Sequence, residues 1–306
     1  MLIKPTSQSG YECNSESACA CKRSSTEASR DVPMPRTVKD QVFLRWLLIT
    51  VLTFMTIGAI NAPAVELRVM TYNIHHAEGM DKKVDAARIA QVISSANADL
   101  VALQEVDRGV ERSQKLDLPK IIASNLGFSF AFGKNINYQG GEYGNAILSR
   151  FPILESNNHH YKMLREGEQR GLLHAKIEIN GNPLLFIATH IDYRPDNAER
   201  LSNVKEILQF ADEHSDTPII LCGDFNDTPN SEVHLRLKER FSDAWESGGE
   251  GPEFTYSSTK PTKRIDFIFV SDTVRVNKAK VLETEASDHL PLFVELDVDL
   301  KTTPSQ

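Results

Sequence analysis

Several apolar segments of the chain end in side chains that could do chemistry. The clearest is "TPIILCGDFND", in which an apolar run leads directly to Asp224 and Asn226. Polar groups at the exit of a buried strand cost free energy unless they are paired. Five more segments carry polar residues at comparable places, and these residues are Asn73, Glu105, His190, Asp266, Asp288 and His289. If the ends of these segments converge, they form one pocket of carboxylates, imidazoles and amides.

A pocket of this composition predicts a metal site. Any one of these residues alone would be a turn former, but six segments share the pattern. Clustered carboxylates repel one another unless a cation lies between them. Carboxylate and amide oxygens suit Mg²⁺, with Mn²⁺ as the alternative, whereas zinc is disfavoured because the motifs lack Cys and no His-x₃-His spacing is present. Asp224 and Asn226 are two residues apart, so in extended chain both would face the site, and Phe225 would face the packed interior.

The segments that carry these residues have the patterns of strands, and amphipathic helices lie between some of them. Strand patterns, either alternating or continuously apolar, occupy residues 65–72, 99–106, 144–153, 171–179, 181–191, 217–224, 264–271 and 288–296. Helical patterns occupy residues 84–98, 118–127 and 196–214. The order of strands and helices does not alternate regularly, and several strands follow hairpin turns. We therefore expect an α/β sandwich with a mixed, largely antiparallel sheet system and helices packed outside it.

Six short motifs, in order, resemble the endonuclease/exonuclease/phosphatase superfamily, whose members include deoxyribonuclease I. They are "TYNIH", "LQEVD", "THID", "GDFND", "RIDFIF" and "SDHLPL", spread over residues 66–298. The segments "YNIHHAEG" and "YGNAILSRFPI" are similar to those of small bacterial members and of the C-terminal domain of the calcofluor-white-hypersensitive protein. The resemblance implies a four-layer α/β sandwich with two central mixed, mainly antiparallel sheets. It also implies a metal-dependent hydrolase of phosphoester bonds.

The resemblance also implies a role for each candidate residue. Glu105 would be the main metal ligand, Asp288 would share the ligation, and Asn73 would help to hold the metal or the phosphate. Asp224 would orient or deprotonate the attacking water, and Asn226 would hold that water or a phosphate oxygen. The remaining three residues would act on the phosphate: His190 by a hydrogen bond, and His289, oriented by Asp266, by stabilising charge or supplying a proton.

Other polar residues carry open alternatives. His75 and His76 either line the cleft or lie in an exposed loop. Asn145 either contacts substrate or closes a turn with its neighbour. Tyr143 is the nearest candidate for the tyrosine that abasic-site endonucleases of the superfamily use, but the surrounding pattern differs and we leave it out. Arg170 either contacts a substrate phosphate or, as we expect, is a solvated arginine.

The N-terminal region has the layout of a leader followed by a secretory signal. Basic residues precede the uncharged run Trp46–Ile60, and Ala62-Pro63-Ala64 forms a small-x-small cleavage motif. Cleavage near Ala64 would give a secreted or periplasmic protein, and an anchor through residues 46–64 is the alternative. The predicted organisation is a disordered leader at 1–33, a signal peptide at 34–64 and one catalytic domain at 65–300. Cys13, Cys19 and Cys21 lie in the leader.

The charge of the chain bears on its partners. The net charge is −8, and the segment after the signal is more acidic, at about −10. Tight binding of long nucleic acid needs a basic face, so we expect the substrate to be a phosphate ester, such as a lipid headgroup or a nucleotide. We also expect the protein to be a monomer. The leading function is an exported Mg²⁺-dependent phosphoesterase acting on a phosphodiester or phosphomonoester. A nuclease and a catalytically silent binding domain are the alternatives, and the sequence does not name the substrate.

Overall fold

The structure is a computed structural model that describes residues 64–300. It contains two six-stranded sheets. The first has the strand order β11 (Val274–Val281), β12 (Leu292–Val298), β1 (Val65–Asn73), β2 (Leu100–Arg108), β4 (Gly141–Ser149), β3 (Ser129–Tyr138). The second has the order β5 (Ile153–His160), β6 (Gly171–Ile179), β7 (Asn182–His190), β8 (Ile219–Asp224), β10 (Asp266–Val270), β9 (Ser242–Asp243). The leader and the signal peptide predicted for residues 1–64 lie almost wholly outside the described residues.

Each sheet contains one parallel pair, and its other strand pairs are antiparallel. The parallel pairs are β1 with β2 and β7 with β8. The expected mixed, mainly antiparallel architecture is confirmed. The parallel pairs matter for the site, because the C-terminal ends of two parallel neighbours lie at the same edge of a sheet.

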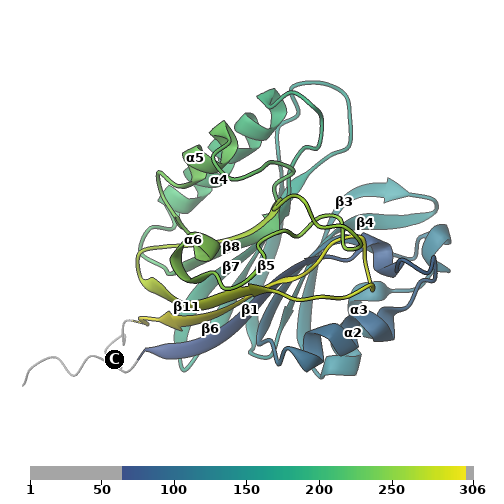
Figure 1. Ribbon diagram of the computed structural model, residues 1–306, viewed down its shortest axis with the longest axis horizontal. Coiled ribbons are helices and arrows are strands. Elements are labelled where there is room, and N and C mark those ends of the chain that lie inside the picture. The colour runs from purple at the N-terminus through teal and green to yellow at the C-terminus, as the bar shows by residue number, and fades with distance from the viewer. Residues whose placement is uncertain (1–63, 301–306) are drawn as a thin grey trace, which may run out of the picture. The chain divides into compact units, whose positions relative to one another are not determined.

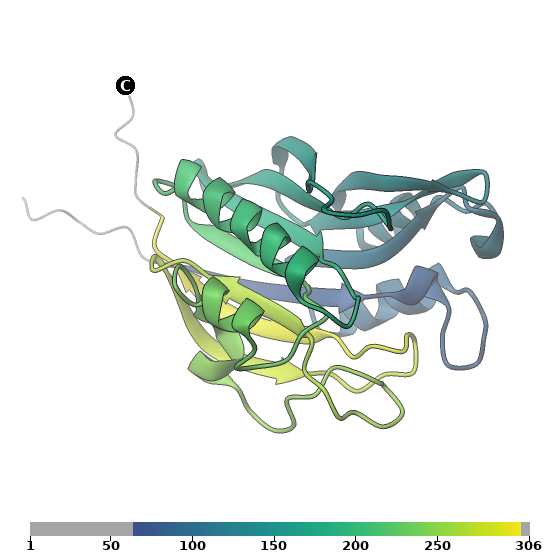
Figure 2. The same cartoon turned by 90° about the horizontal axis from the view of Figure 1, so that it is seen from above.

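Helices cover the outer face of each sheet and complete four layers (Figure 1). The helices α2 (Ala86–Ser95) and α3 (Leu118–Leu126) pack on the first sheet. The helices α4 (Ala198–Glu213) and α5 (Glu232–Leu237) pack on the second, and Figure 2 shows α4 lying along that sheet. Three short helices, η1 (His75–Ala77), η2 (Glu111–Ser113) and α6 (Ala244–Gly248), lie in connections. Among the described residues, no helix is long and apolar enough to cross a membrane.

The apolar core is divided into an inner layer and two outer layers by the alternation of side chains along the strands. On β1, Val69 packs between the two sheets, whereas Met70 packs under the helices of the first sheet. On β7, Phe186 faces the inner layer and Ile187 faces α4. Successive side chains on a strand point to opposite faces, so strands that are apolar throughout are buried on both faces. This explains the continuous apolar runs in the sequence.

Side chains and one glycine fix the ends of the helices. Asp85 and Asp117 cap α2 and α3 by accepting hydrogen bonds from the backbone N–H groups of Arg88 and Lys120. Gly127 ends α3 in the left-handed conformation, with φ of 68°, as the sequence pattern predicts.

Candidate active site

The eight residues selected from the sequence gather at one place. Six of them line a cavity of about 500 Å³, and these are Glu105, His190, Asp224, Asn226, Asp288 and His289. The other two, Asn73 and Asp266, are fully buried and hydrogen-bond to side chains that line the cavity. The expected convergence of the strand ends is therefore seen in the structure.

Strand register places three of these residues side by side. His190 at the end of β7 is opposite Asp224 at the end of β8, across a parallel pair. Asp266, the first residue of β10, is opposite Asp224 on the other side. Asp224 Oδ2 lies 3.6 Å from His190 Nε2. The central strands of the second sheet thus form one wall of the site.

Glu105 reaches the site from a bulge in β2. The strand pattern predicted at residues 99–106 extends further in the structure, because β2 continues to Arg108. The pairing with β4 shifts between Leu103 and Val106, and Glu105 has a φ of 58°. A bulge re-aims a side chain without ending the strand, and here it directs Glu105 into the cavity.

Glycine is required on the strand opposite this bulge. A Cβ atom on Gly144 of β4 would lie 1.9 Å from the carbonyl oxygen of Gly133 on β3. No side chain fits at that distance, so the close approach of β3 and β4 beside the bulge depends on this glycine.

Asn73 links the two walls of the site. Its Nδ2 donates hydrogen bonds to Glu105 Oε1 and Asp224 Oδ2, both at 3.0 Å. Its Oδ1 accepts from the backbone N–H of His75 at 3.1 Å. The side chain is fully buried, and each of its amide atoms already has a partner. Asn73 therefore holds the two carboxylates at a fixed spacing, and its direct contact with a metal stays a prediction.

Asp224 is a buried carboxyl group with a raised pKa. Burial raises its pKa, the nearby Asp266 carboxylate raises it further, and the result is about 7. His289 and the donors on Asn226 and Asn73 act in the opposite direction. A carboxyl group with a pKa near neutrality can exchange a proton with a substrate or a water in the physiological range.

His289 is a buried cation held by a carboxylate. Its Nδ1 lies 2.8 Å from Asp266 Oδ2, and its Nε2 lies 3.7 Å from Asp224 Oδ2. Burial alone would lower the pKa of His289, but Asp266 and then Asp224 and Asp288 outweigh it and raise the pKa to about 10. The imidazole is therefore protonated at neutral pH, and its Nε2–H faces Asp224.

The turn before β12 brings His289 and Asp288 to the same site. The Ser287 hydroxyl donates to the backbone carbonyl of Asn73 at 2.8 Å and accepts from the backbone N–H of His289 at 3.3 Å. Adjacent residues on a regular strand point to opposite faces, so this turn is what lets both side chains line one cavity.

Asn226 and His190 form a pair beside Asp224. Asn226 Nδ2 donates to His190 Nε2 at 2.9 Å, and the Asn226 backbone N–H donates to Asp224 Oδ1 at 2.9 Å. Burial, followed by the charges of Arg170 and His289, lowers the pKa of His190 well below its usual range, so this imidazole is neutral. Asn226 is not in extended chain as we expected, because its φ is 47°. Phe225 does face the packed interior, as predicted.

Two carboxylates at the mouth of the site have no strong cationic partner. Within residues 64–300, Glu105 forms no ion pair with a Lys, Arg or His side chain, and the contact of Asp288 with His75 Nδ1 is long, at 3.9 Å. Both side chains line the cavity. Hard oxygen donors that lack a counter-charge fit Mg²⁺ or Mn²⁺, so the residues present suit the expected ion.

Arg170 belongs to the site, and our expectation of a solvated arginine was wrong. Its side chain is 6% exposed, lines the cavity and lies 3.1 Å from Glu168 Oε1. Within residues 64–300, its Nε atom is buried without a hydrogen-bond partner, and its guanidinium lies over the Tyr193 ring, 5.6 Å from the ring centre. Arg170 directly precedes β6, and Tyr193, which follows β7, is the contact from a distant part of the sequence.

The cavity has further lining residues that the sequence analysis missed or left out. They are Tyr143, Glu168, Tyr193, Tyr256, Lys263 and Ile265. Tyr143 is the residue that we set aside; burial and then the Glu105 carboxylate raise its pKa well above the usual range. The Tyr256 ring lies 4.9 Å from the His289 ring. No short motif marks these positions.

Asn145 has neither of the two roles considered for it, which were contact with substrate and closure of a turn. It lies within β4, is 1% exposed, and donates through Nδ2 to the carbonyl of Gly171 on β6 at 3.3 Å. It therefore joins the two sheets beneath the cavity, and it does not close a turn.

These features define a class of protein: an α/β sandwich of two sheets whose strand ends carry an acidic, histidine-containing pocket. The chain belongs to the endonuclease/exonuclease/phosphatase family, whose model matches residues 70–289.

The similar proteins extend over most of the described domain. The chain is 27% identical over 245 residues to the uncharacterised protein YbhP of Escherichia coli (strain K12), covering 75% of this chain and 95% of that protein. It is 26% identical over 216 residues to the 5′-tyrosyl-DNA phosphodiesterase of Caenorhabditis elegans, covering 66% of this chain and 54% of that enzyme. The solved structure of a mannosyl-6-phosphatase from Bacteroides thetaiotaomicron has a TM-score of 0.63 at 23% identity and covers 75% of this chain and 99% of that one. At this identity, the structural likeness shows the fold alone.

Proposed function

We propose that the protein hydrolyses a phosphoester bond with the help of Mg²⁺ or Mn²⁺ at the cavity beside Asp224. One observation carries the proposal: a buried carboxyl with a pKa near 7, Asp224, lies between a protonated imidazole, His289, and a carboxylate, Glu105, that forms no ion pair within residues 64–300. A binding domain has no evident use for a base, an acid and a further carboxylate in this arrangement. The family and its named members support the same reaction class.

The residues of the chain divide the work. Glu105 and Asp288 would hold the cation, and Asn73 fixes the spacing between Glu105 and Asp224. When bound, the cation would neutralise charge on the phosphate and stabilise the leaving oxygen. Ionised Asp224 orients the attacking water and accepts its proton. His289 donates from Nε2 to the phosphate as negative charge grows on it, and Asp266 keeps that imidazole protonated.

Arg170 extends the site toward the substrate. Its guanidinium is always charged, is buried in the cavity wall, and has an Nε–H without a partner. We infer that it binds a phosphate oxygen, and that Lys263 and Tyr193 at the cavity rim contact the group that the phosphate carries. The acidic charge of the chain favours a small phosphate ester over long nucleic acid.

The test is a panel of phosphomonoesters and phosphodiesters, including sugar phosphates, nucleotides, phospholipids and supercoiled plasmid, assayed with Mg²⁺ and with Mn²⁺. We expect release of phosphate or alcohol from a small ester and little nicking of plasmid. Arg170→Ala should lose about 10²-fold in kcat/KM on that ester, whereas Arg165→Ala, an exposed arginine paired with Asp196, should not change it. No hydrolysis of any member would refute the proposal, and efficient plasmid nicking alone would favour the nuclease.

Export and the monomeric state remain part of the proposal. The signal pattern at residues 34–64 predicts that the mature chain begins near Val65. Sequencing the N-terminus of protein recovered from the periplasm or medium tests this, and intact protein retained in the cytosol would contradict it.

A further inference from the structure

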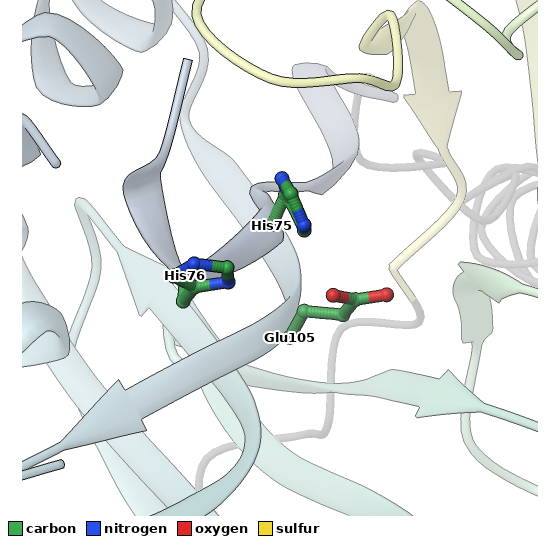
Figure 3. A group of neighbouring side chains, drawn as sticks. All are labelled: His75, His76 and Glu105. Carbon is green, nitrogen blue, oxygen red and sulfur yellow. The ribbon is translucent and has the colours of Figure 1, made fainter. Parts of the chain in front are cut away.

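A second group of ligand-type side chains lies beside the active site. His75, His76 and Glu105 each offer one ligand atom, and these three atoms all lie within 4.8 Å of one another. Figure 3 shows the two imidazoles and the Glu105 carboxylate turned toward a common space. Neither histidine is among the residues that line the catalytic cavity, but His75 Nδ1 lies 3.9 Å from Asp288 Oδ1, so the cluster borders that cavity and shares Glu105 with it.

His76 is buried without the hydrogen bonds that a buried imidazole needs. Its side chain is 7% exposed, which excludes the exposed-loop alternative for this residue. Among residues 64–300, its Nδ1 has no hydrogen-bond partner, and its Nε2 lies 3.8 Å from Glu78 Oε2, beyond hydrogen-bond distance. Leaving such a group unpaired costs about 1–3 kcal/mol, and an unpaired buried polar group points to a ligand that completes it.

The backbone holds the two histidines in an unusual arrangement. His75, His76 and Ala77 have φ values of 44°, 46° and 64°, and Ala77 is fully buried. Non-glycine residues enter the left-handed region at a cost, and here the fold keeps three in succession. This conformation is what allows adjacent residues to face one space, which neither a strand nor a regular helix permits.

We propose that His75, His76 and Glu105 form a second cation site, which takes a borderline divalent ion such as Zn²⁺ or Co²⁺. Two imidazole nitrogens and one carboxylate are a three-residue set that leaves a position open for water or substrate. Metal–ligand bonds of about 2.1 Å need ligand atoms about 3.4 Å apart in tetrahedral geometry. His75, with 30% of its side chain exposed, is free to turn and close the remaining distance, while His76 and Glu105 stay in place.

This site goes beyond the proposed function and does not depend on it. It shares Glu105 with the proposed Mg²⁺ site, but its donors are nitrogen-rich, and nitrogen ligands favour Zn²⁺ and Co²⁺ over Mg²⁺. The prediction against zinc in the sequence analysis considered only Cys motifs and His-x₃-His spacing. Adjacent histidines in the left-handed conformation are another way to place two imidazole ligands at one ion.

The test is a titration of the full chain with Co²⁺, followed by its visible absorption and by calorimetry, with Zn²⁺ as competitor. Cys13, Cys19 and Cys21 would also bind these ions, so every protein carries Cys→Ser at those three positions. We expect one Co²⁺ site that His75→Ala/His76→Ala weakens by about 100-fold or more, since loss of an outer-shell partner alone costs about 10- to 100-fold.

The chain offers a matched control. His159 and His160 are also adjacent, but they are exposed, and each ring already has a hydrogen-bond partner. His159→Ala/His160→Ala should leave the Co²⁺ affinity unchanged. Equal losses in both double variants, no loss in either, or no binding at all would overturn the proposal. If the first double variant does not fold, His75→Ala alone should weaken binding about tenfold or more, and an unchanged affinity would refute it. Hydrolysis is not the readout, so failure of the proposed reaction leaves this result standing.

Discussion

Replacing Asp224 by Asn should abolish most of the activity and yet stabilise the cation-free protein. The substitution keeps the shape of the side chain but removes the base, so we expect kcat to fall by about 10² to 10⁴. The carboxyl pKa of about 7, against an ordinary value of 3.8, means that the ionised group is disfavoured in the fold. Each unit is about 1.4 kcal/mol, so ionised Asp224 costs at most about 4 kcal/mol above neutral pH.

The net gain is smaller because Asn has one acceptor oxygen. Asp224 accepts from both the Asn226 backbone N–H and Asn73 Nδ2, and Asn can serve only one of them, which costs about 1 kcal/mol. We expect a stabilisation of about 1–3 kcal/mol in EDTA at pH 8, or a rise in Tm of about 2–4 °C per kcal/mol. The sign follows from the raised pKa: the cost is absent below pH 3.8, grows with pH, and is complete above about 7.

The measurement combines steady-state kinetics with thermal unfolding in EDTA from pH 5 to pH 8. Asp212→Asn is the control, because Asp212 is largely exposed, and it should change neither quantity. Asp224→Asn protein that unfolds, or that keeps full activity on the true substrate, would show that "GDFND" is only a structural turn and that the proposed mechanism is wrong.

Three further predictions concern the cation, the phosphate and the stability of the fold. Glu105→Gln should raise the Mg²⁺ concentration for half-maximal activity by about tenfold or more, and added Mg²⁺ should recover part of the rate; a metal titration that matches wild type would refute this. His289→Ala should lower kcat by about 10²-fold or more with no recovery at high Mg²⁺, because its charge acts on the phosphate; rescue by Mg²⁺ would contradict that role. Asp243→Asn should destabilise the protein by about 3 kcal/mol in urea unfolding at pH 7, because Asp243 is buried against His234 and Arg264. Burial works to raise the pKa of Asp243, but these two partners outweigh burial and lower the pKa. The stabilisation by ionised Asp243 is therefore present at neutral pH and is lost as the pH falls through the lowered pKa. The difference in stability between wild type and Asp243→Asn should shrink in acid, and a constant difference would contradict this role.

The sequence predicted the place of a residue in the fold correctly where the signal is local. Asn73, His190 and Asp224 each end a strand, and a strand end can be recognised from the composition of one segment. Parallel pairing places His190 beside Asp224 in the second sheet. Packing of the two sheets then brings Asn73 of β1 to Asp224.

The errors concern features that depend on a partner far away in sequence. The bulge that directs Glu105 exists only relative to β4, so the sequence of β2 alone did not show it. Arg170 lies under the Tyr193 ring, which follows β7, and the sequence around Arg170 does not reveal this contact. For Asn145, a turn was one of the two roles considered because it follows a glycine, but that glycine allows the close approach of Gly133.

The most direct test of the central claim is hydrolysis of the best phosphate ester from the panel by wild type and Asp224→Asn, each in EDTA and after addition of excess Mg²⁺. We expect wild type to be inactive in EDTA and to recover its activity with Mg²⁺, while Asp224→Asn stays about 10² to 10⁴ slower with saturating Mg²⁺. Wild-type activity that survives EDTA, or equal rates for the two proteins in Mg²⁺, would contradict it.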